Sequence, residues 1–188
     1  MSDFYDSELA LETERLILRP LAASDAADFY SLLASDPEVT RYYVLEGIES
    51  AEDPGIARIL EGFARREQYG FALRDKRTDA FLGIIHQCGG MNPYFPNVEI
   101  GYALGRAYWN QGYMTEALQA FIDLLFRKGV HKVFASHIRE NAASGRVMRK
   151  CGMLPEGERK AELFYKGKYH DFCCYYRLNP GENTEEHA

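Results

Sequence analysis

The spacing of apolar residues changes several times along the chain, and each change predicts a different element. Alternation of polar and apolar residues predicts a strand over residues 15–21, and two similar segments, residues 70–74 and 81–86, predict a hairpin. Apolar residues at helical spacing follow Ser24, which we expect to cap a helix, and recur over residues 54–68. The first half of the chain is therefore expected to contain one strand, two helices and a hairpin.

The second half of the chain has the clearer periodicity. An amphipathic helix is predicted between Gly112 and Gly129, and Asn141 is placed to cap a short helix that ends at Gly152. Strand patterns occupy four further segments: residues 98–104, 130–137, 155–165 and 170–178. The last two of these strands are expected to pair as an antiparallel hairpin that turns near Gly167.

The order of these elements predicts an α/β (α+β) fold, in which a central mixed sheet of about seven strands is flanked by about four helices. We expect residues 1–188 to form a single domain, because the chain contains no linker and no internal repeat. Residues 1–12 and 180–188 have little to bury and are expected to be loose termini. Strands and helices do not alternate regularly, which disfavours a dinucleotide-binding fold of the Rossmann kind.

Charge and cysteine content narrow the class of partner. The chain of 188 residues has a net charge of −6 and no basic stripe, so we expect no nucleic-acid partner. The acidic balance mildly favours a cationic partner such as an amine, although it more often reflects solubility alone. No cluster of potential ligands has the spacing of a metal site, and no CxxC pair occurs among the four cysteines, so we expect no metal: Cys88, Cys151, Cys173 and Cys174.

The N-terminal residues are acidic and lack the apolar core of a signal peptide, and no apolar run approaches the ~20 residues of a membrane helix. We therefore expect a cytoplasmic protein without a membrane partner. The residues give no indication of its oligomeric state.

The start of the helix after Gly112 is a candidate anion site. The first amides of a helix have no partner within it and lie at its positive end, and a glycine there lets a phosphate approach the backbone. The alternative is that Gly112 only eases a tight turn. The segment contains neither a P-loop, GxxxxGK[ST], nor the GxGxxG of dinucleotide-binding proteins.

The second informative segment is the short helix that follows Asn141. Its expected buried face carries Val147, Met148 and Cys151, and it begins with a hydroxyl, Ser144, in the first turn. Ser144 is either a second cap or a solvated serine, or it is a hydrogen-bond donor at the mouth of a cleft.

Four blocks in this order carry a resemblance to a known family: TERLILRPL, EIGYALGRAYWNQGYMTEAL, NAASGRVMRKCGM and GKYHDFCCYYRL. From about Leu11 to Leu178, the chain resembles the GNAT acetyltransferase superfamily, in particular its RimJ/RimL-type branch. The resemblance implies a GNAT-like fold, with a twisted sheet that is splayed between residues 98–104 and 130–137. It also implies an N-acetyltransferase that uses acetyl-coenzyme A as co-substrate.

The resemblance also assigns roles to residues. Backbone groups of Ala103 and Leu104 are expected to pair with the pantetheine arm, and Asn141 is expected to contact that arm near the thioester. The pyrophosphate is expected on the amides of five consecutive residues: Gln111, Gly112, Tyr113, Met114 and Thr115. Here Trp109 and Met114 replace the usual residue types of the phosphate loop, but binding is expected to survive because the contacts come from the backbone.

The expected reaction is direct attack of a neutral amine on the thioester within a ternary complex. Glu99 is the candidate base, through water, although it is equally a surface carboxylate of a strand. Ser144 is the candidate donor to the departing thiolate, because many relatives have a tyrosine where this chain has Met148. Four aromatic residues are candidates for the acceptor pocket and equally for the core: Tyr42, Tyr43, Phe164 and Tyr165.

Two other functions remain open at this level. Met148 in place of a catalytic tyrosine favours a catalytically weak module of the same fold that binds or senses coenzyme A. The other alternative is a structural or interaction protein, in which the helix starts at Gly112 and Asn141 would have no functional role. The residues do not distinguish a protein N-terminus from a small-molecule amine or an antibiotic as the acceptor.

Overall fold

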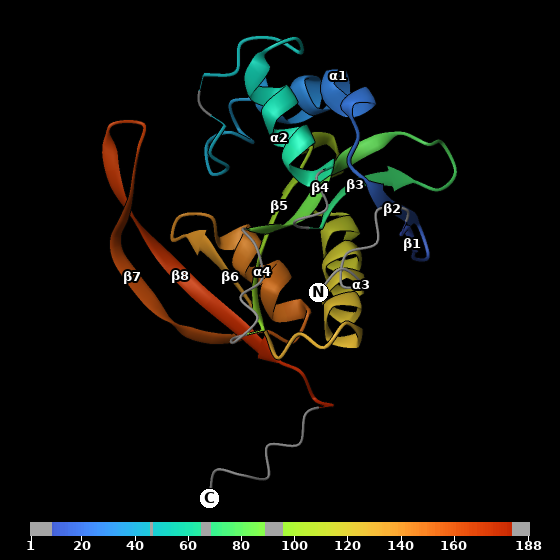
Figure 1. Ribbon diagram of the computed structural model, residues 1–188. Helices are drawn as coiled ribbons and strands as arrows, with labels where there is room; N and C mark the ends of the chain where they lie inside the picture. The colour runs from blue at the N-terminus through green and yellow to red at the C-terminus, as the bar shows by residue number, and fades with distance from the viewer. Residues whose placement is uncertain (1–8, 46, 65–68, 89–95, 182–188) are drawn as a thin grey trace, which may run out of the picture.

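A single sheet runs through the part of the chain that the computed structural model describes, residues 9–45, 47–64, 69–88 and 96–181 (Figure 1). It has eight strands in the order β1-β2-β3-β4-β5-β6-β8-β7. Their bounds are β1 Leu11–Glu12, β2 Leu16–Pro20, β3 Gly70–Asp75, β4 Phe81–Cys88, β5 Asn97–Leu104, β6 Lys132–Ile138, β7 Leu154–Tyr165 and β8 Lys168–Leu178. The expected mixed α/β sheet is confirmed.

The sheet has one strand more than expected. Leu11–Glu12 pairs with β2 although residues 1–12 were expected to be loose, and residues 1–8 lie outside the described residues. Thr13 holds the intervening turn, because its amide donates to the Leu16 carbonyl and its hydroxyl accepts from the Leu16 amide. A strand of two residues has no readable period, which is why its pattern predicted nothing.

The helices are few and mostly short. Their bounds are α1 Ala26–Phe29, α2 Pro54–Ala64, α3 Tyr113–Arg127 and α4 Ala142–Lys150, with single helical turns η1 Ala23–Asp25, η2 Tyr30–Ala34 and η3 Arg106–Tyr108. The expectation that α2 extends to Gln68 falls on residues outside the described ones. No helix among the described residues is long and apolar enough to cross a membrane.

Helices cover the two faces of the sheet in separate groups. On one face, α3 and α4 pack on a core that includes Leu73 and Phe121. On the other, α1, η2 and α2 pack on a core that includes Ala72 and Phe29. Leu73 and Ala72 are neighbours in β3, so the alternation of a strand divides them between the two cores. Figure 1 shows α1 and α2 together at one end of the molecule, beyond the ends of β4 and β5.

Neighbouring strands are antiparallel everywhere except at β5 and β6. These two run parallel, and they pair only where Asn97–Glu99 meets Lys132–Phe134. Past these residues, β5 continues to Leu104 and β6 to Ile138, but the two strands no longer pair with each other. The sheet is therefore splayed between the two strands, as the resemblance implied.

The first helical segment begins differently from the prediction. Ser24 is exposed and is not the cap; η1 is preceded by Ala22, whose amide donates to the carboxylate of Asp25 at 2.9 Å. Asp25 is only 1% exposed and accepts two hydrogen bonds from Arg19, while Arg74 lies 3.7 Å from the same carboxylate. These cations come from β2 and β3, so a buried ion pair, not a serine, fixes the start of the helical segment.

This ion pair gives a stability prediction. We expect Asp25→Ala to lower the free energy of unfolding by about 3 kcal/mol, because it leaves two arginines without their buried partner. Asp28→Ala is the matched control, since Asp28 also pairs with Arg74, at 3.5 Å, but is 48% exposed; its expected cost is about 0.5 kcal/mol. Urea unfolding measures both. Equal losses in the two variants would show that Asp25 does not anchor this segment.

Candidate active site

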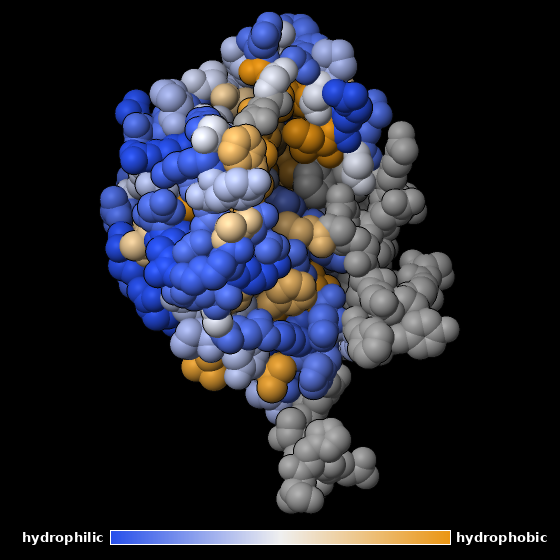
Figure 2. Space-filling model, turned by 90° about the vertical axis from the view of Figure 1, so that its left-hand side faces the viewer, coloured by the Kyte–Doolittle hydropathy of each residue, from blue (hydrophilic) through white to orange (hydrophobic). Residues whose placement is uncertain are grey.

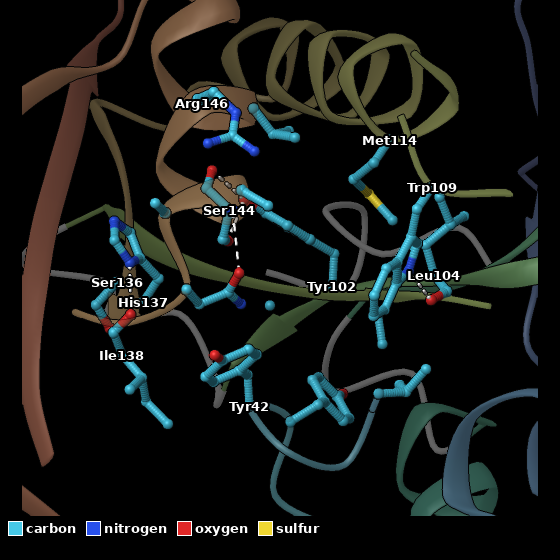
Figure 3. A pocket seen from close by; sticks show the side chains of 18 of the residues that line it. Tyr42, Tyr102, Leu104, Trp109, Met114, Ser136, His137, Ile138, Ser144 and Arg146 are labelled. Carbon is cyan, nitrogen blue, oxygen red and sulfur yellow. Dashed lines mark hydrogen bonds between the residues drawn. The ribbon is translucent and has the colours of Figure 1, made fainter. Parts of the chain in front are cut away.

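A cleft opens where β5 and β6 part. Its volume is about 780 Å³, and it is lined by the diverging ends of the two strands, by the first turn of α3, by α4 and by residues 38, 39 and 42–44, which follow η2. Figure 3 shows the side chains that converge on it, among them Tyr102 from β5 and Ser144 from α4. The cleft thus brings together segments that are far apart in the sequence.

The first turn of α3 presents free backbone donors at the cleft. Gly112 precedes the helix in the left-handed conformation, with φ of 84°, and no side chain caps the helix there. The first hydrogen bond of the helix runs from the Glu116 amide to the Gly112 carbonyl. Within the described residues, the amides of Tyr113, Met114 and Thr115 therefore have no acceptor, and this end of the helix suits an anion.

Arg15, the residue directly before β2, holds this first turn of α3 in place. Its guanidinium donates to the Glu116 carboxylate at 2.7 Å and to the Gln111 carbonyl at 2.9 Å, and it lies 4.3 Å from the centre of the Tyr113 ring. Burial alone would raise the pKa of Glu116, but hydrogen bonds from Thr13 and Arg15 outweigh burial and keep the pKa below its usual value. The acid in the first turn is thus ionised and already paired, so it does not oppose an anion at the free amides.

The end of β5 forms one wall of the cleft. The Gly105 amide donates to Leu82 of β4, so by the alternation of a strand the backbone groups of Leu104 face away from β4, toward the splay. The Leu104 carbonyl accepts a hydrogen bond from the Trp109 indole at 2.7 Å. A Cβ on Gly83 of β4 would lie 2.3 Å from the Ala103 carbonyl, which therefore faces β4. Leu104, with its amide, is better placed than Ala103 to meet a ligand through its backbone.

The start of α4 forms the opposite wall. Asn141 caps the helix, because its side-chain oxygen accepts from the Ser144 amide at 3.3 Å. The Ser144 hydroxyl lies 2.8 Å from the Tyr102 hydroxyl, and both residues line the cleft (Figure 3). Met148, four residues further along the same helix, is 1% exposed in the core beneath Ser144.

Glu99 lies at the point where the two strands separate. It is half-buried and lines the cleft, and the Ser136 hydroxyl of β6 donates to its carboxylate at 3.4 Å. The guanidinium of Arg159 in turn donates to Ser136 at 3.1 Å. The carboxylate therefore sits at the inner end of a short hydrogen-bonded chain that begins at the protein surface.

The aromatic candidates divide into two groups. Tyr42 and Tyr43 line the cleft, and the Tyr43 hydroxyl lies 2.7 Å from Nε2 of His86. Burial raises the pKa of Tyr43 and lowers that of His86, so both groups are neutral at physiological pH and the tyrosine donates to the imidazole.

The other two aromatic candidates do not reach the cleft. Phe164 is 62% exposed and packs against Tyr169 on the outer face of the β7–β8 hairpin. Tyr165 is buried, and its hydroxyl donates to the Thr40 carbonyl at 2.7 Å. The hairpin instead contributes two other residues to the lining, Leu163 and Phe172.

Several lining residues escaped the sequence reasoning. Tyr102 and Ser136 are hydroxyls on β5 and β6 that face Ser144 and Glu99, and no local pattern links them to these partners. Arg146 and Lys150 are a detectable pair, because residues four apart share one face of a helix, and both line the cleft from α4. Among the described residues, no group of three or more histidine, cysteine, aspartate or glutamate side chains is arranged to hold a metal ion.

Comparison with known proteins agrees with this geometry. The acetyltransferase (GNAT) domain family matches residues 15–154. The uncharacterized N-acetyltransferase YoaA of Bacillus subtilis is 30% identical over 179 residues, which are 92% of this chain and 98% of YoaA. The ribosomal-protein-serine acetyltransferase of Escherichia coli is 26% identical over 171 residues, 88% of this chain and 94% of that protein.

Solved structures share the fold. RimL, a ribosomal L7/L12 alpha-N-protein acetyltransferase in complex with coenzyme A, matches with a TM-score of 0.80 at 21% identity, over 90% of this chain and 98% of that chain. At this identity the match is evidence of the fold alone.

The cap of α4 can be tested by stability. Asn141→Ala removes the acceptor for the Ser144 amide and is expected to lower the free energy of unfolding by about 1 kcal/mol. Asn141→Asp keeps an acceptor and is expected to restore most of that loss. Chemical denaturation of the two variants is the measurement, and a loss of the same size in both would show that the loss does not come from the missing hydrogen-bond acceptor.

Proposed function

The chain belongs to the GNAT acetyltransferase family, in its RimJ/RimL-like branch, and we propose that this acyltransferase moves an acetyl group from acetyl-coenzyme A to a primary amine, either a protein N-terminus or a small molecule. One observation carries the proposal: a single cleft joins the free amides of the first turn of α3 to the Ser144 hydroxyl. An anion-binding end and a hydrogen-bond donor therefore lie along one continuous groove.

The cleft fits the chemistry of the donor. The amides of Tyr113, Met114 and Thr115 suit the pyrophosphate, and Arg146 and Lys150 add positive charge to the same lining. The splay between β5 and β6 leaves the outward-facing backbone at the end of β5 free to pair with an amide-containing arm. RimL binds coenzyme A within the same fold, which supports the assignment.

The residues of the cleft also suit amine acetylation. An aliphatic amine is protonated at neutral pH, so it must lose a proton before it attacks the thioester. Glu99 takes this proton, through a water molecule, and the Ser136 hydroxyl orients its carboxylate. The Leu104 amide polarises the carbonyl of the acetyl group, because a backbone donor aimed at a developing negative charge stabilises the transition state.

Ser144 acts on the leaving group. As the amine displaces the thiolate, negative charge develops on sulfur, and the Ser144 hydroxyl donates a hydrogen bond to it. Met148 has no proton to give and lies in the core, so it takes no part.

A catalytically weak module of the same fold that binds coenzyme A is the second candidate. The observation in its favour is Met148, a residue without a proton where many relatives have a tyrosine. Tight binding of acetyl-coenzyme A together with no transfer to any of a broad set of amines and N-terminal peptides would support this module over the enzyme.

Binding at the start of α3 is tested by a pair of glycine variants. Gly112 and Gly129 both have positive φ, 84° and 82°, at opposite ends of α3, so valine at either position is strained by about 1–2 kcal/mol. Acetyl-coenzyme A is expected to raise the Tm of the wild type and of Gly129→Val, but not that of Gly112→Val. An equal rise in both variants would place the phosphates elsewhere.

The role of Ser144 is tested by turnover. We expect Ser144→Ala to lower kcat by about tenfold to a thousandfold, as for the loss of one donor to a developing charge, with little change in the KM for acetyl-coenzyme A. Steady-state kinetics on an accepted amine measure both constants, and the Tm of the same variant separates catalysis from folding. Wild-type turnover in Ser144→Ala would remove the hydroxyl from the mechanism.

A further inference from the structure

Tyr102 is a half-buried tyrosine that lines the cleft and that the proposed reaction does not use. It projects from β5 toward α4, and its hydroxyl lies 2.8 Å from Oγ of Ser144 and 3.1 Å from the Ser144 carbonyl oxygen. Both contacts are to a single residue, which is 42 positions away in the sequence. Figure 3 shows the Tyr102 side chain reaching toward Ser144 beside the cleft.

The contact spans a part of the fold that the sheet leaves open. Past Glu99, no backbone pairing joins β5 to β6, and α4 follows β6 in the chain. The wall that carries Leu104 and the wall that carries Ser144 are therefore not held together there by the sheet. The Tyr102–Ser144 contact links these two walls directly at the reacting end of the cleft.

Resting on the proposed function, we propose that Tyr102 is a positioning residue for Ser144: it aligns the serine hydroxyl and donates to its oxygen while that hydroxyl donates to the departing sulfur. The contacts allow two arrangements of the two hydroxyl protons. In the first, Tyr102 donates to the Ser144 carbonyl and accepts from Oγ, so the serine proton is directed at Tyr102 and not at the ligand. In the second, Tyr102 donates to Oγ, and the serine proton is free to point at the ligand.

The developing charge selects between these arrangements. Negative charge on sulfur favours the second arrangement, because the serine then donates to the sulfur and the tyrosine donates to the serine. The change needs only rotation of two hydroxyl groups. Burial raises the pKa of Tyr102, so its proton is retained throughout the physiological range.

No proton leaves the pair. A thiol has a pKa of about 8.5 and a phenol about 10 in water, so transfer of the Tyr102 proton through Ser144 to the thiolate is uphill even before burial raises the phenol further. The sulfur departs as a thiolate that is hydrogen-bonded by Ser144, and both hydroxyls keep their protons. Tyr102 therefore acts by orientation and polarisation and not as an acid.

The test is a double-mutant cycle on kcat. Tyr102→Phe keeps the ring and removes the hydroxyl, and it is expected to lower kcat about tenfold without changing the KM for acetyl-coenzyme A. In the Ser144→Ala background the same change is expected to have no further effect, because the oxygen that Tyr102 orients is gone. Tyr175→Phe is the matched control, since it removes a hydroxyl that contacts α4 through Arg149, and kcat is expected to stay at the wild-type value.

The pH dependence adds a second readout. Because no proton is transferred, the ratio of wild-type to Tyr102→Phe kcat is expected to be constant from pH 6.5 to 8.5. Wild-type kcat in Tyr102→Phe, an equal loss in the serine and alanine backgrounds, or a ratio that changes with pH would each overturn the positioning role. A wild type that binds acetyl-coenzyme A and acetylates no amine would instead overturn the proposed function, and the role of Tyr102 with it.

Discussion

The short parallel pairing of β5 and β6 is the constraint on which the rest of the structure depends. Each strand is held along its length by its other neighbour: β5 by β4 from Glu99 to Leu104, and β6 by β8 from Lys132 to Ile138. The two strands therefore keep their conformation after they separate, and the splay is a rigid opening between two sheet halves. Without these flanking strands, the separated ends of β5 and β6 would have no backbone partner on either edge. That would be costly, because buried backbone donors and acceptors need partners.

The opening between β5 and β6 determines where the helices that follow these strands begin. The helices that follow the two parting strands, α3 and α4, begin on the same side of the sheet, so the free amides of α3 and the cap of α4 meet across one cleft. Arg15 neutralises Glu116 at the first of these helix starts, and Asn141 satisfies the first turn of the second. The face that carries β7 and β8 is mostly hydrophilic, and apolar residues gather in a hollow of it (Figure 2). A polar rim around an apolar recess suits a small ligand that buries its uncharged part.

Local patterns were sufficient for the strands longer than two residues and for the two helix starts of the site. The amphipathic period of α3, the glycine before it and the asparagine before α4 are signals that lie within a few residues of the feature that they predict. Signals failed where the cause is distant in sequence. Asp25 replaces Ser24 at the first helical segment because Arg19 and Arg74 reach it from two strands, and no window around Ser24 contains both. Phe164 and Tyr165 are adjacent in a strand, so at most one of them could have faced the cleft.

The contact between the two hydroxyl groups of the cleft could not be predicted from the sequence, because only the fold brings these residues together. Ser144 and Met148 share a face of α4, but Met148 packs in the core, where a tyrosine hydroxyl would be far from solvent and would need a buried partner. The phenol that does approach Ser144 comes from β5, across the opening, and its oxygen is satisfied by the serine itself. A tyrosine on the strand thus stands beside a serine on the helix, and neither residue is within the other's local sequence. Met148 therefore does not leave Ser144 without a phenol beside it. Tyr102 supplies that phenol from the opposite wall, where in the proposed mechanism it orients the donor without becoming the acid.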